Sequence, residues 1–477
     1  MNRRLAKYSL PILLILASSV VFAQTKTMSL EACIQYALTN NLNIKDQGIN
    51  IQRNELYLSQ DKMDRYPTLN SSTSYNYNFG RSIDPFTNQF VNRSIQNNNF
   101  SLTTAVTLYN GNRISKTIDR SKNEVIRGEA ELALVKNQIS LSVADAYLQI
   151  IYAVKQLELI TNQMASTQQL LERAKQLLDA GKTNKMEFLN LSAQLATDQV
   201  LKQNAEGNIR QSYVLLKQVL QYPNDEELLI EIPEMAKPLV LEKLPLNQLV
   251  DQALEALPEV ELAELQLNTA RLNVDIAQSG LYPRLSMYGN VNTIFSESRL
   301  KFTESHVETV NIGYVEATGD DVFARYQRYS SVTAPFGEQL SDNFGQSVGL
   351  SLSIPIYNNN QMRSNVSQSK LDVLQGENNV ERVKMQLTSE IYSSYTAYEN
   401  ALANYTASKT STAAQEENYK FLEQRYEAGL NTVIDMQIAR TSWLSALNQQ
   451  ERAKFELIFA QTRLNFYQTG NIKLITE

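Results

Sequence analysis

Four short segments of the chain alternate between apolar and polar residues. They cover about 68–79, 99–109, 284–296 and 346–357, and the clearest alternation runs from Val348 to Ile356. A repeat of period two places one kind of residue on each face of a β-strand. Strands of about 10–13 residues with one apolar face have the length and pattern of membrane-crossing strands. A half-buried antiparallel sheet has the same pattern, so both interpretations stay open at this point.

Two much longer segments, about 112–179 and 360–427, have helical periodicity. At 1.5 Å per residue, each helix would extend roughly 100 Å. A seam with alternating steps of four and three runs from Ile139 to Met164, which is coiled-coil spacing. The equivalent seam from Leu387 to Tyr405 is smaller and more polar, and we expect it at a subunit boundary or facing water. The core stripe of a solitary bundle would also produce either seam.

Each long helix ends at an Ala-Gly pair and is followed by a return helix. Gly181 and Gly429 suit the left-handed position that ends a helix. Threonine and asparagine residues follow each glycine and can cap the return helix. An acid then stands in the first turn of each return helix, Glu187 and Asp435. Each of these stretches is therefore predicted to be the tip of a helical hairpin.

The two halves of the chain repeat this order of elements. Ser29–Leu69 aligns without gaps on Pro245–Leu285, and both segments end in Tyr-Pro-x-Leu. The motifs LYNGN and IYNNN correspond later at a changed spacing, which requires an insertion in the second half. We therefore predict a first repeat at 24–235, with a tip near 181, and a second at 236–477, with a tip near 429. The other helices are expected at about 30–40, 42–65, 185–220, 246–257, 259–281 and 431–467.

The connecting segments are polar. A loop at about 80–98 joins the first two strands, and a much longer one at about 296–344 joins the other two. This longer loop contains His306 and several aromatic residues, and we expect it to be mobile or to cover the mouth of a barrel. The proline-rich connector 222–245 joins the halves and is expected to contain a short apolar strand at Leu228–Ile232.

The N-terminus predicts export. Residues 1–23 have basic residues, an apolar run and a small-residue cleavage site, as in a secretory signal peptide. The sequence LEAC, ending at Cys33, superficially matches a lipoprotein site, but polar residues separate it from the apolar run. We therefore prefer a buried helical cysteine. No other run reaches the roughly 18 apolar residues of a membrane helix.

The composition argues against several classes of function. The net charge of −6 gives no indication of nucleic-acid binding. The single cysteine and single histidine exclude a disulfide framework and argue against a Cys/His metal site. The sequence shows no nucleophile, phosphate-binding loop or metal-ligand spacing, and His306 is best explained as an exposed loop residue. We therefore assign no catalytic residue, cofactor or metal.

Four strands in one chain cannot close a barrel. About eight strands is the smallest closed size, and lipid does not tolerate open strand edges. If the strands cross a membrane, chains must associate, and three chains would give about 12 strands, although the sequence does not determine that number. A strand barrel continued by the long helices would form a conduit across much of a periplasm.

The ordered set of features resembles the TolC-like outer-membrane efflux protein family over about 24–477. The motifs that carry this resemblance are SLEACIQYALTNN, the two Tyr-Pro junctions, LYNGN and IYNNN, and the tips LLDAGKTNKMEF and YEAGLNTVIDMQ. The resemblance implies an α+β membrane protein that forms a homotrimer. A β-barrel with four strands per chain would lie among outer-membrane lipids, and an α-helical barrel would lie in the periplasm. The connector 222–245 would contribute to an equatorial collar.

The resemblance also implies a function without chemistry. Family members are exit ducts of tripartite efflux pumps, in which the tips meet a periplasmic adaptor (membrane fusion) protein coupled to an inner-membrane transporter. Type I protein secretion is the alternative, and the substrate stays open among drugs, bile salts, metal ions and polypeptides. The residues expected to dock the adaptor are Gly181, Lys182, Thr183, Gly429, Leu430 and Asn431.

A gate is expected near the tips, because acidic and tyrosine side chains close the periplasmic entrance in family members. Glu187 and Asp435 match the acidic positions and Tyr426 matches a gate tyrosine. Asn431 stands where an arginine can occur, and Ile438 where a second acid can. Symmetry-related carboxylates around a narrow mouth would repel one another and favour cations or a wider opening. Alternatively, each acid only offsets a helix dipole.

A surface-anchored stalk or adhesin is a second class of function that the strands and long helices would permit. Stalks of that kind normally precede one terminal anchor, whereas here strand pairs interrupt the helices twice. Protease access to the tips in intact cells separates the two classes, because a duct hides its tips in the periplasm and an adhesin displays them.

Overall fold

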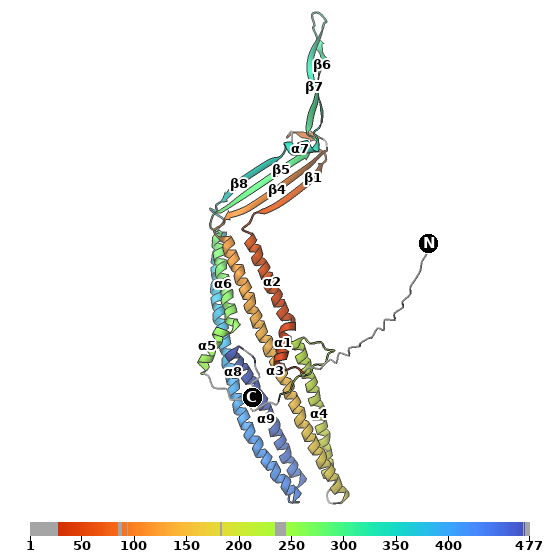
Figure 1. The fold of residues 1–477 in the computed structure, drawn as a ribbon, viewed down its shortest axis with the longest axis vertical. Coiled ribbons are helices and arrows are strands. Elements are labelled where there is room, and N and C mark those ends of the chain that lie inside the picture. Colours follow the sequence, from red (N-terminus) through yellow and green to blue (C-terminus); the bar gives the residue numbers. More distant parts are fainter. Residues whose placement is uncertain are drawn as a thin grey trace, which may run out of the picture. The chain divides into compact units, whose positions relative to one another are not determined.

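The computed structural model describes residues 27–83, 88–92, 94–181, 184–233, 245–470 and 472 (Figure 1). The predicted signal peptide and part of the connector therefore lie outside the described residues. The helices are α1 (Leu30–Asn40), α2 (Leu42–Met63), α3 (Arg113–Asp179), α4 (Lys185–Leu220), α5 (Leu246–Ala256), α6 (Pro258–Ser279), α7 (Phe336–Asp342), α8 (Gln361–Glu427) and α9 (Val433–Thr469). The strands are β1 (Thr68–Asn78), β2 (Arg81–Ile83), β3 (Phe90–Asn92), β4 (Ile95–Tyr109), β5 (Arg284–Ser296), β6 (Leu300–Tyr314), β7 (Asp321–Thr333) and β8 (Gly345–Ser353).

Two compact units alternate along the chain. Unit 1 combines the described parts of Met1–Asp46, Ala133–Leu257 and Gln386–Glu477, and unit 2 combines Gln47–Leu132 and Pro258–Met385. Each unit therefore draws segments from both halves of the sequence. None of the helices in the described ranges is long and apolar enough to cross a membrane.

Unit 2 contains an antiparallel four-stranded sheet in the order β1-β4-β5-β8 (Figure 1). The strands β1 and β5 begin and end close to the predicted positions. The strand β4 begins at Ile95 rather than near 99, and β8 ends at Ser353 rather than near 357. Arg284, the first residue of β5, pairs with Ser353, so no partner strand lies beyond it. Pro355 also lacks the amide that would continue the ladder.

The predicted alternation gives the sheet one apolar face. The register places Leu285 opposite Leu352 and Met287 opposite Leu350, so large apolar residues share this face. Leu350 and Leu352 are nevertheless 65% and 61% exposed. Large exposed apolar patches mark surfaces that meet a partner or a membrane. The chain by itself therefore does not bury this face.

The segment 296–344 is folded, where the sequence analysis expected a polar loop. The strands β6 and β7 pair along their length as a hairpin, and α7 anchors its base. Gln339 of α7 is fully buried, accepts a hydrogen bond from the Ser296 amide and donates to the Ser296 and Ala334 carbonyls. Charged residues interrupt the alternation of apolar and polar positions in this segment, so the sequence did not predict its strands. Two of these residues, Arg328 and Glu308, form an ion pair across the hairpin.

Two smaller expectations also differ from the structure. The loop at 80–98 contains the short hairpin β2–β3, in which the Arg81 guanidinium lies over the Phe90 ring. The apolar segment near Ile230 forms one isolated parallel bridge with Met28 instead of a strand. A single bridge forms there because only Met28 offers it backbone partners in the described part of the chain.

The core of unit 1 contains both predicted seams. Val143 and Ile150 of α3 are fully buried, and so are Ile391 and Tyr398 of α8. The second seam was expected at a subunit boundary or in water, so this expectation is wrong for these positions. The helices of the same chain cover them. Cys33 is also buried, within α1, and burial raises the pKa of its thiol to about 12.

The joints that lead from strand to long helix use left-handed backbone. Gly111 and Asn112 have φ of 65°, and Asn359 and Asn360 have φ of 51° and 63°. A Cβ at Gly111 would lie 2.6 Å from the Ser279 carbonyl oxygen. The motifs LYNGN and IYNNN therefore serve the same turn, and only the first requires glycine for close approach as well as for φ.

Gly111→Ala is expected to destabilise unit 2, because the new methyl group meets backbone that cannot move freely. A non-glycine residue at this φ costs about 1–3 kcal/mol before that contact is counted. The thermal unfolding midpoint of the purified protein should fall by several degrees. Asn359→Gly is the matched control at the corresponding joint, and its midpoint should stay the same or rise. Equal midpoints for wild type and Gly111→Ala would contradict the close approach at Ser279.

Candidate functional site at the helix tips

The backbone of each tip follows the predicted pattern. Gly181 and Gly429 have φ of 73° and 74°. The Leu430 amide donates to the Arg425 carbonyl and the Gly429 amide to the Tyr426 carbonyl, each at 2.9 Å, which is the Schellman arrangement that ends α8. The predicted docking residues Lys182 and Thr183 lie outside the described residues.

The return helices begin with side-chain caps. Asn184 accepts a hydrogen bond from the Glu187 amide at 3.0 Å. Thr432 and Asp435 form a reciprocal capping box, in which the Asp435 carboxylate accepts from the Thr432 hydroxyl at 2.6 Å and from its amide at 3.2 Å. Of the two predicted gate acids, Asp435 thus holds the start of α9.

Glu187 and Tyr426 meet across the two hairpins. The Tyr426 hydroxyl, at the end of α8, donates to Glu187 Oε1 at the start of α4, at 2.8 Å. Burial, followed by the hydrogen bond to Glu187, raises the pKa of Tyr426 to about 12. The hydroxyl therefore keeps its proton at neutral pH and can donate to the carboxylate. A second link joins Arg173 of α3 to Glu427 of α8 at 3.3 Å.

A small apolar cluster lies directly behind these links. The Tyr419 ring of α8 stacks on the Trp443 ring of α9, with centroids 5.2 Å apart and planes 4° from parallel. Met436 and Ala439 are buried in the same cluster, and Leu170 of α3 packs against it. The two hairpins therefore share a packed core near their tips, and the polar links lie at its edge.

A buried polar network holds the hairpins together deeper in unit 1. Arg440 of α9 donates through Nη1 to the Thr167 hydroxyl at 3.1 Å and through Nη2 to the Gln163 carbonyl at 2.9 Å. Thr167 donates to the Asp198 carboxylate of α4 at 2.6 Å, and Gln163 and Gln194 also donate to it, at 2.7 and 2.9 Å. Asp198 is fully buried, so its charge is satisfied by these donors.

The sequence analysis did not identify this network, although a signal was present. The buried positions Leu191, Asp198, Ala205 and Ser212 of α4 recur at heptad spacing. An aspartate in such a seam requires polar partners on the facing helices. Those partners come from α3 and α9, which no local pattern connects to this position.

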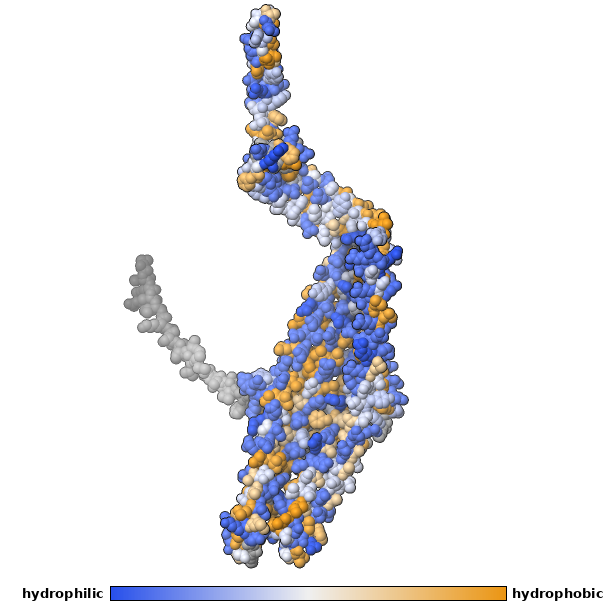
Figure 2. Space-filling model, turned by 180° about the vertical axis from the view of Figure 1, so that it is seen from behind, coloured by the Kyte–Doolittle hydropathy of each residue, from blue (hydrophilic) through white to orange (hydrophobic). Residues whose placement is uncertain are grey.

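Exposed apolar residues surround the tips. Leu430 is 69% and Ile438 62% exposed, and Met186, Leu189 and Ile434 are also exposed. Figure 2 shows apolar surface at this end of the helices. Asn431, at a position where an arginine can occur, instead accepts a hydrogen bond from Arg425 Nε at 3.1 Å. The tips therefore present a surface of mixed apolar and polar residues.

Comparison with known proteins identifies the family. The model of a protein family described as "Outer membrane efflux protein" matches residues 33–220 and 249–468 of the chain. The chain belongs to the outer membrane efflux protein family. The predicted resemblance is thereby confirmed, and with it the outer-membrane location. Both hairpin tips and all four strands of the large sheet fall within the two matched segments. Most of the connector lies between these segments and is not matched.

Individual members of this family are distant from the chain. It is 23% identical to the outer membrane protein TolC of Escherichia coli (strain K12) over 68% of its own length, and 20% identical to the proteases secretion protein PrtF of Dickeya chrysanthemi over 66%. These alignments span 60% of the length of either relative. The solved structure of CusC matches with a TM-score of 0.74 at 15% identity, covering 93% of this chain and 92% of that one, which shows the shared fold.

Proposed function

We propose that this family member is the outer-membrane exit duct of a tripartite efflux pump. It acts as a passive trimeric channel, and it carries substrates from an inner-membrane transporter across the periplasm and outer membrane. The observation that supports the proposal most strongly is the sheet, whose apolar face is exposed and whose edge strands are β1 and β8. Lipid would cover the apolar face, and neighbouring copies would pair with the edges.

Three copies of the sheet would give a closed barrel of about 12 strands. The order α1, α2, β1, β4, α3, α4 recurs as α5, α6, β5, β8, α8, α9, which supports the two proposed repeats at 24–235 and 236–477. In this arrangement the helical hairpins continue the duct into the periplasm. No residue of the chain needs to act as a catalyst.

The tips serve as gate and docking surface in this proposal. Glu187 and Tyr426 close the entrance by tying the two hairpins of one chain together, and Asp435 shapes the start of α9 beside them. The adaptor would meet the turns that contain Gly181, Lys182 and Thr183 and those that contain Gly429, Leu430 and Asn431. The exposed apolar side chain of Leu430 fits such a contact.

A role in type I protein secretion is the second candidate. The relative PrtF is named as a protease secretion protein, which is the observation that favours this alternative. The channel itself would work in the same way, and the partners would differ. Co-purification of the chain with either an efflux transporter or an ATP-driven protein exporter from its own cells distinguishes the two.

Single-channel recording tests the proposed duct. The purified protein in a planar bilayer should give discrete, cation-selective conductance steps, because carboxylates surround the expected entrance. Native mass spectrometry of the same sample should give the mass of three chains. A monomer without conductance would reject the duct and bring back the anchored stalk.

A further inference from the structure

The large sheet has a polar face opposite the apolar face that contains Leu285 and Leu352. One row of this polar face crosses all four strands and consists of Asn70, Thr103, Asn290 and Ser347. Asparagine, serine and threonine also supply most of its other side chains. In these four strands, which the structure describes throughout, Arg284 is the only charged residue on this face. In the proposed duct, lipid covers the apolar face, so the polar face lines the conduit.

Tyr288 forms an aromatic surface on the polar face. It pairs with Ala105 on one side and with Gly349 on the other. A Cβ at Gly349 would lie 2.5 Å from Cζ and from the hydroxyl oxygen of Tyr288, so the ring lies over the bare backbone of β8. The Tyr288 side chain is nevertheless 47% exposed. The missing side chain at Gly349 therefore lets the ring lie against the sheet while its other side stays accessible.

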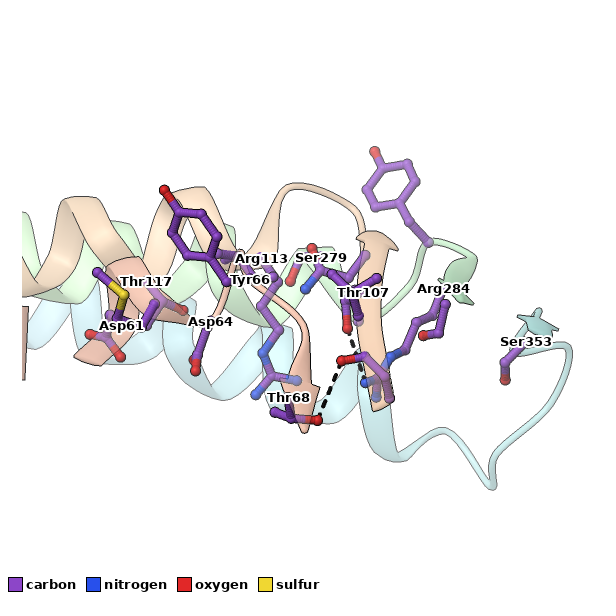
Figure 3. Close-up of a pocket in the computed structure, with 18 of the residues that line it drawn as sticks. Asp61, Asp64, Tyr66, Thr68, Thr107, Arg113, Thr117, Ser279, Arg284 and Ser353 are labelled. Carbon is purple, nitrogen blue, oxygen red and sulfur yellow. Dashed lines mark hydrogen bonds between the residues drawn. The ribbon is translucent and has the colours of Figure 1, made fainter. Parts of the chain in front are cut away.

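A polar cleft opens beside Tyr288, at the end of the same face that is nearest to the helices (Figure 3). Its volume is about 960 Å³, within the range of small-molecule sites. Ala105, the partner of Tyr288, lines the cleft. The hydroxyl groups that line it from the sheet belong to Thr68, Thr107, Ser286 and Ser353.

The charged residues of the cleft balance one another. Asp61 and Asp64 line it from the end of α2, Arg113 from the start of α3 and Arg284 from the start of β5 (Figure 3). The lining therefore has no net formal charge, and it favours ligands of neither sign. Carboxylate and guanidinium groups each present polar atoms in one plane, and each can bind two neighbouring hydroxyl groups.

An accessible aromatic ring beside such polar groups suits a saccharide. A sugar ring has C–H groups on its faces, which pack against an aromatic ring, and hydroxyl groups around its edge, which donate and accept hydrogen bonds. A charged solute would gain no net attraction from this lining. An apolar solute would leave the polar groups of the cleft without partners, which is unfavourable.

We propose that Tyr288 and this cleft together form a binding site for neutral saccharides. Tyr288 packs against one sugar ring, and the polar groups of the cleft bind the hydroxyl groups of the next. The proposal rests on the proposed duct, because it names a class of solute that the duct carries. Binding itself does not require conductance, so the site and the duct can be tested separately.

The test is a calorimetric titration of the full-length protein with maltohexaose, a neutral oligosaccharide. The detergent must lack a sugar head group, because a maltoside would compete for the site. The wild type should bind maltohexaose saturably, and maltohexaose should also interrupt the single-channel current. Polyethylene glycol of the same mass should not bind, because it has neither a hydroxyl-bearing ring nor a flat C–H face.

Single variants place the effect at the site. Tyr288→Ser should weaken maltohexaose binding about tenfold, whereas Tyr288→Phe keeps the ring and should keep most of the affinity. Gly349→Ala should also weaken binding, because the new methyl group displaces the ring. Arg113→Ala should weaken it from the cleft side. Tyr75→Ser is the matched control, because Tyr75 is exposed on the opposite face of the same sheet, and this variant should bind as wild type.

Three results would overturn the proposal. They are a wild type without saturable maltohexaose binding, equal losses in Tyr288→Ser and Tyr75→Ser, and equal binding of polyethylene glycol. If Tyr288→Ser does not fold, the comparison of the two solutes and the Gly349→Ala variant still decide. A conducting channel that does not bind maltohexaose would reject the site and leave the duct intact. Binding without conductance would keep the site and reject the duct.

Discussion

Asp198→Leu is expected to lower the stability of unit 1 by about 3 kcal/mol, because it removes one of the carboxylates that offset the buried Arg440 guanidinium. Arg440 is only 2% exposed, and burial lowers its pKa while Tyr419, Asp198 and Glu423 oppose that shift. After the change, Glu423 is the remaining carboxylate among the groups that raise the pKa of Arg440. The thermal midpoint should fall by roughly 10 °C.

A double-mutant cycle separates the charge effect from packing. Arg440→Met alone should also destabilise, since the Asp198 carboxylate then lacks its counter-charge, which acts through Thr167. The double variant Asp198→Leu/Arg440→Met should be clearly more stable than the sum of the two single losses predicts. Glu206→Gln, an exposed change on the same helix, should stay within about 0.5 kcal/mol of wild type. If the stability loss of the double variant equals the sum of the two single losses, Asp198 and Arg440 do not stabilise the fold through each other.

Tyr426→Phe combined with Arg173→Gln is expected to open the channel. The first change removes the hydrogen bond to Glu187, and the second removes the ion pair with Glu427. A hydrogen bond to a charged group contributes about 1.5 kcal/mol or more, so its loss should raise the open-to-closed ratio roughly tenfold. The exposed ion pair should add little. Single-channel recording of the purified protein measures this ratio directly.

The same link predicts a pH dependence. Because the pKa of Tyr426 is raised from its ordinary value of 10 to about 12, the folded state favours the protonated hydroxyl. The link is fully present below pH 10 and is lost as the pH rises toward 12. Open probability of the wild type should therefore increase between pH 10 and 12, where the hydroxyl ionises. The Tyr426→Phe protein should lack this increase.

Two variants on the same helix serve as controls for the Tyr426 and Arg173 variants. Tyr392→Phe removes a partly exposed hydroxyl from α8, and Lys420→Gln removes the ion pair with Glu416 within α8. Neither change should alter the open probability or its pH dependence. If the Tyr426→Phe/Arg173→Gln protein has the same open probability as the wild type, the contacts between the tips of one chain do not close the entrance. This conclusion would hold even if the duct itself conducts.

The elements whose formation depends on nearby residues could be predicted from the sequence. Helical periodicity and the caps at Asn184 and Thr432 gave the bounds of the long helices within a few residues, because both depend on neighbours in the chain. The left-handed residues at Gly181 and Gly429 follow from the same local chemistry. Alternation also predicted the apolar face of the large sheet. The β6–β7 hairpin was missed, because its charges are paired between strands and interrupt the alternation.

The contacts that carry the proposals required the tertiary structure. Glu187 and Tyr426 are 239 positions apart, and Thr167 and Arg440 are 273 apart, so no local pattern joins them. The ends of the four strands of the large sheet lie at one edge only because the register pairs segments far apart in the chain. The sequence by itself therefore determined which elements form and which family the chain resembles. The tertiary structure decided which side chains meet, because packing alone brings distant positions of the chain into contact.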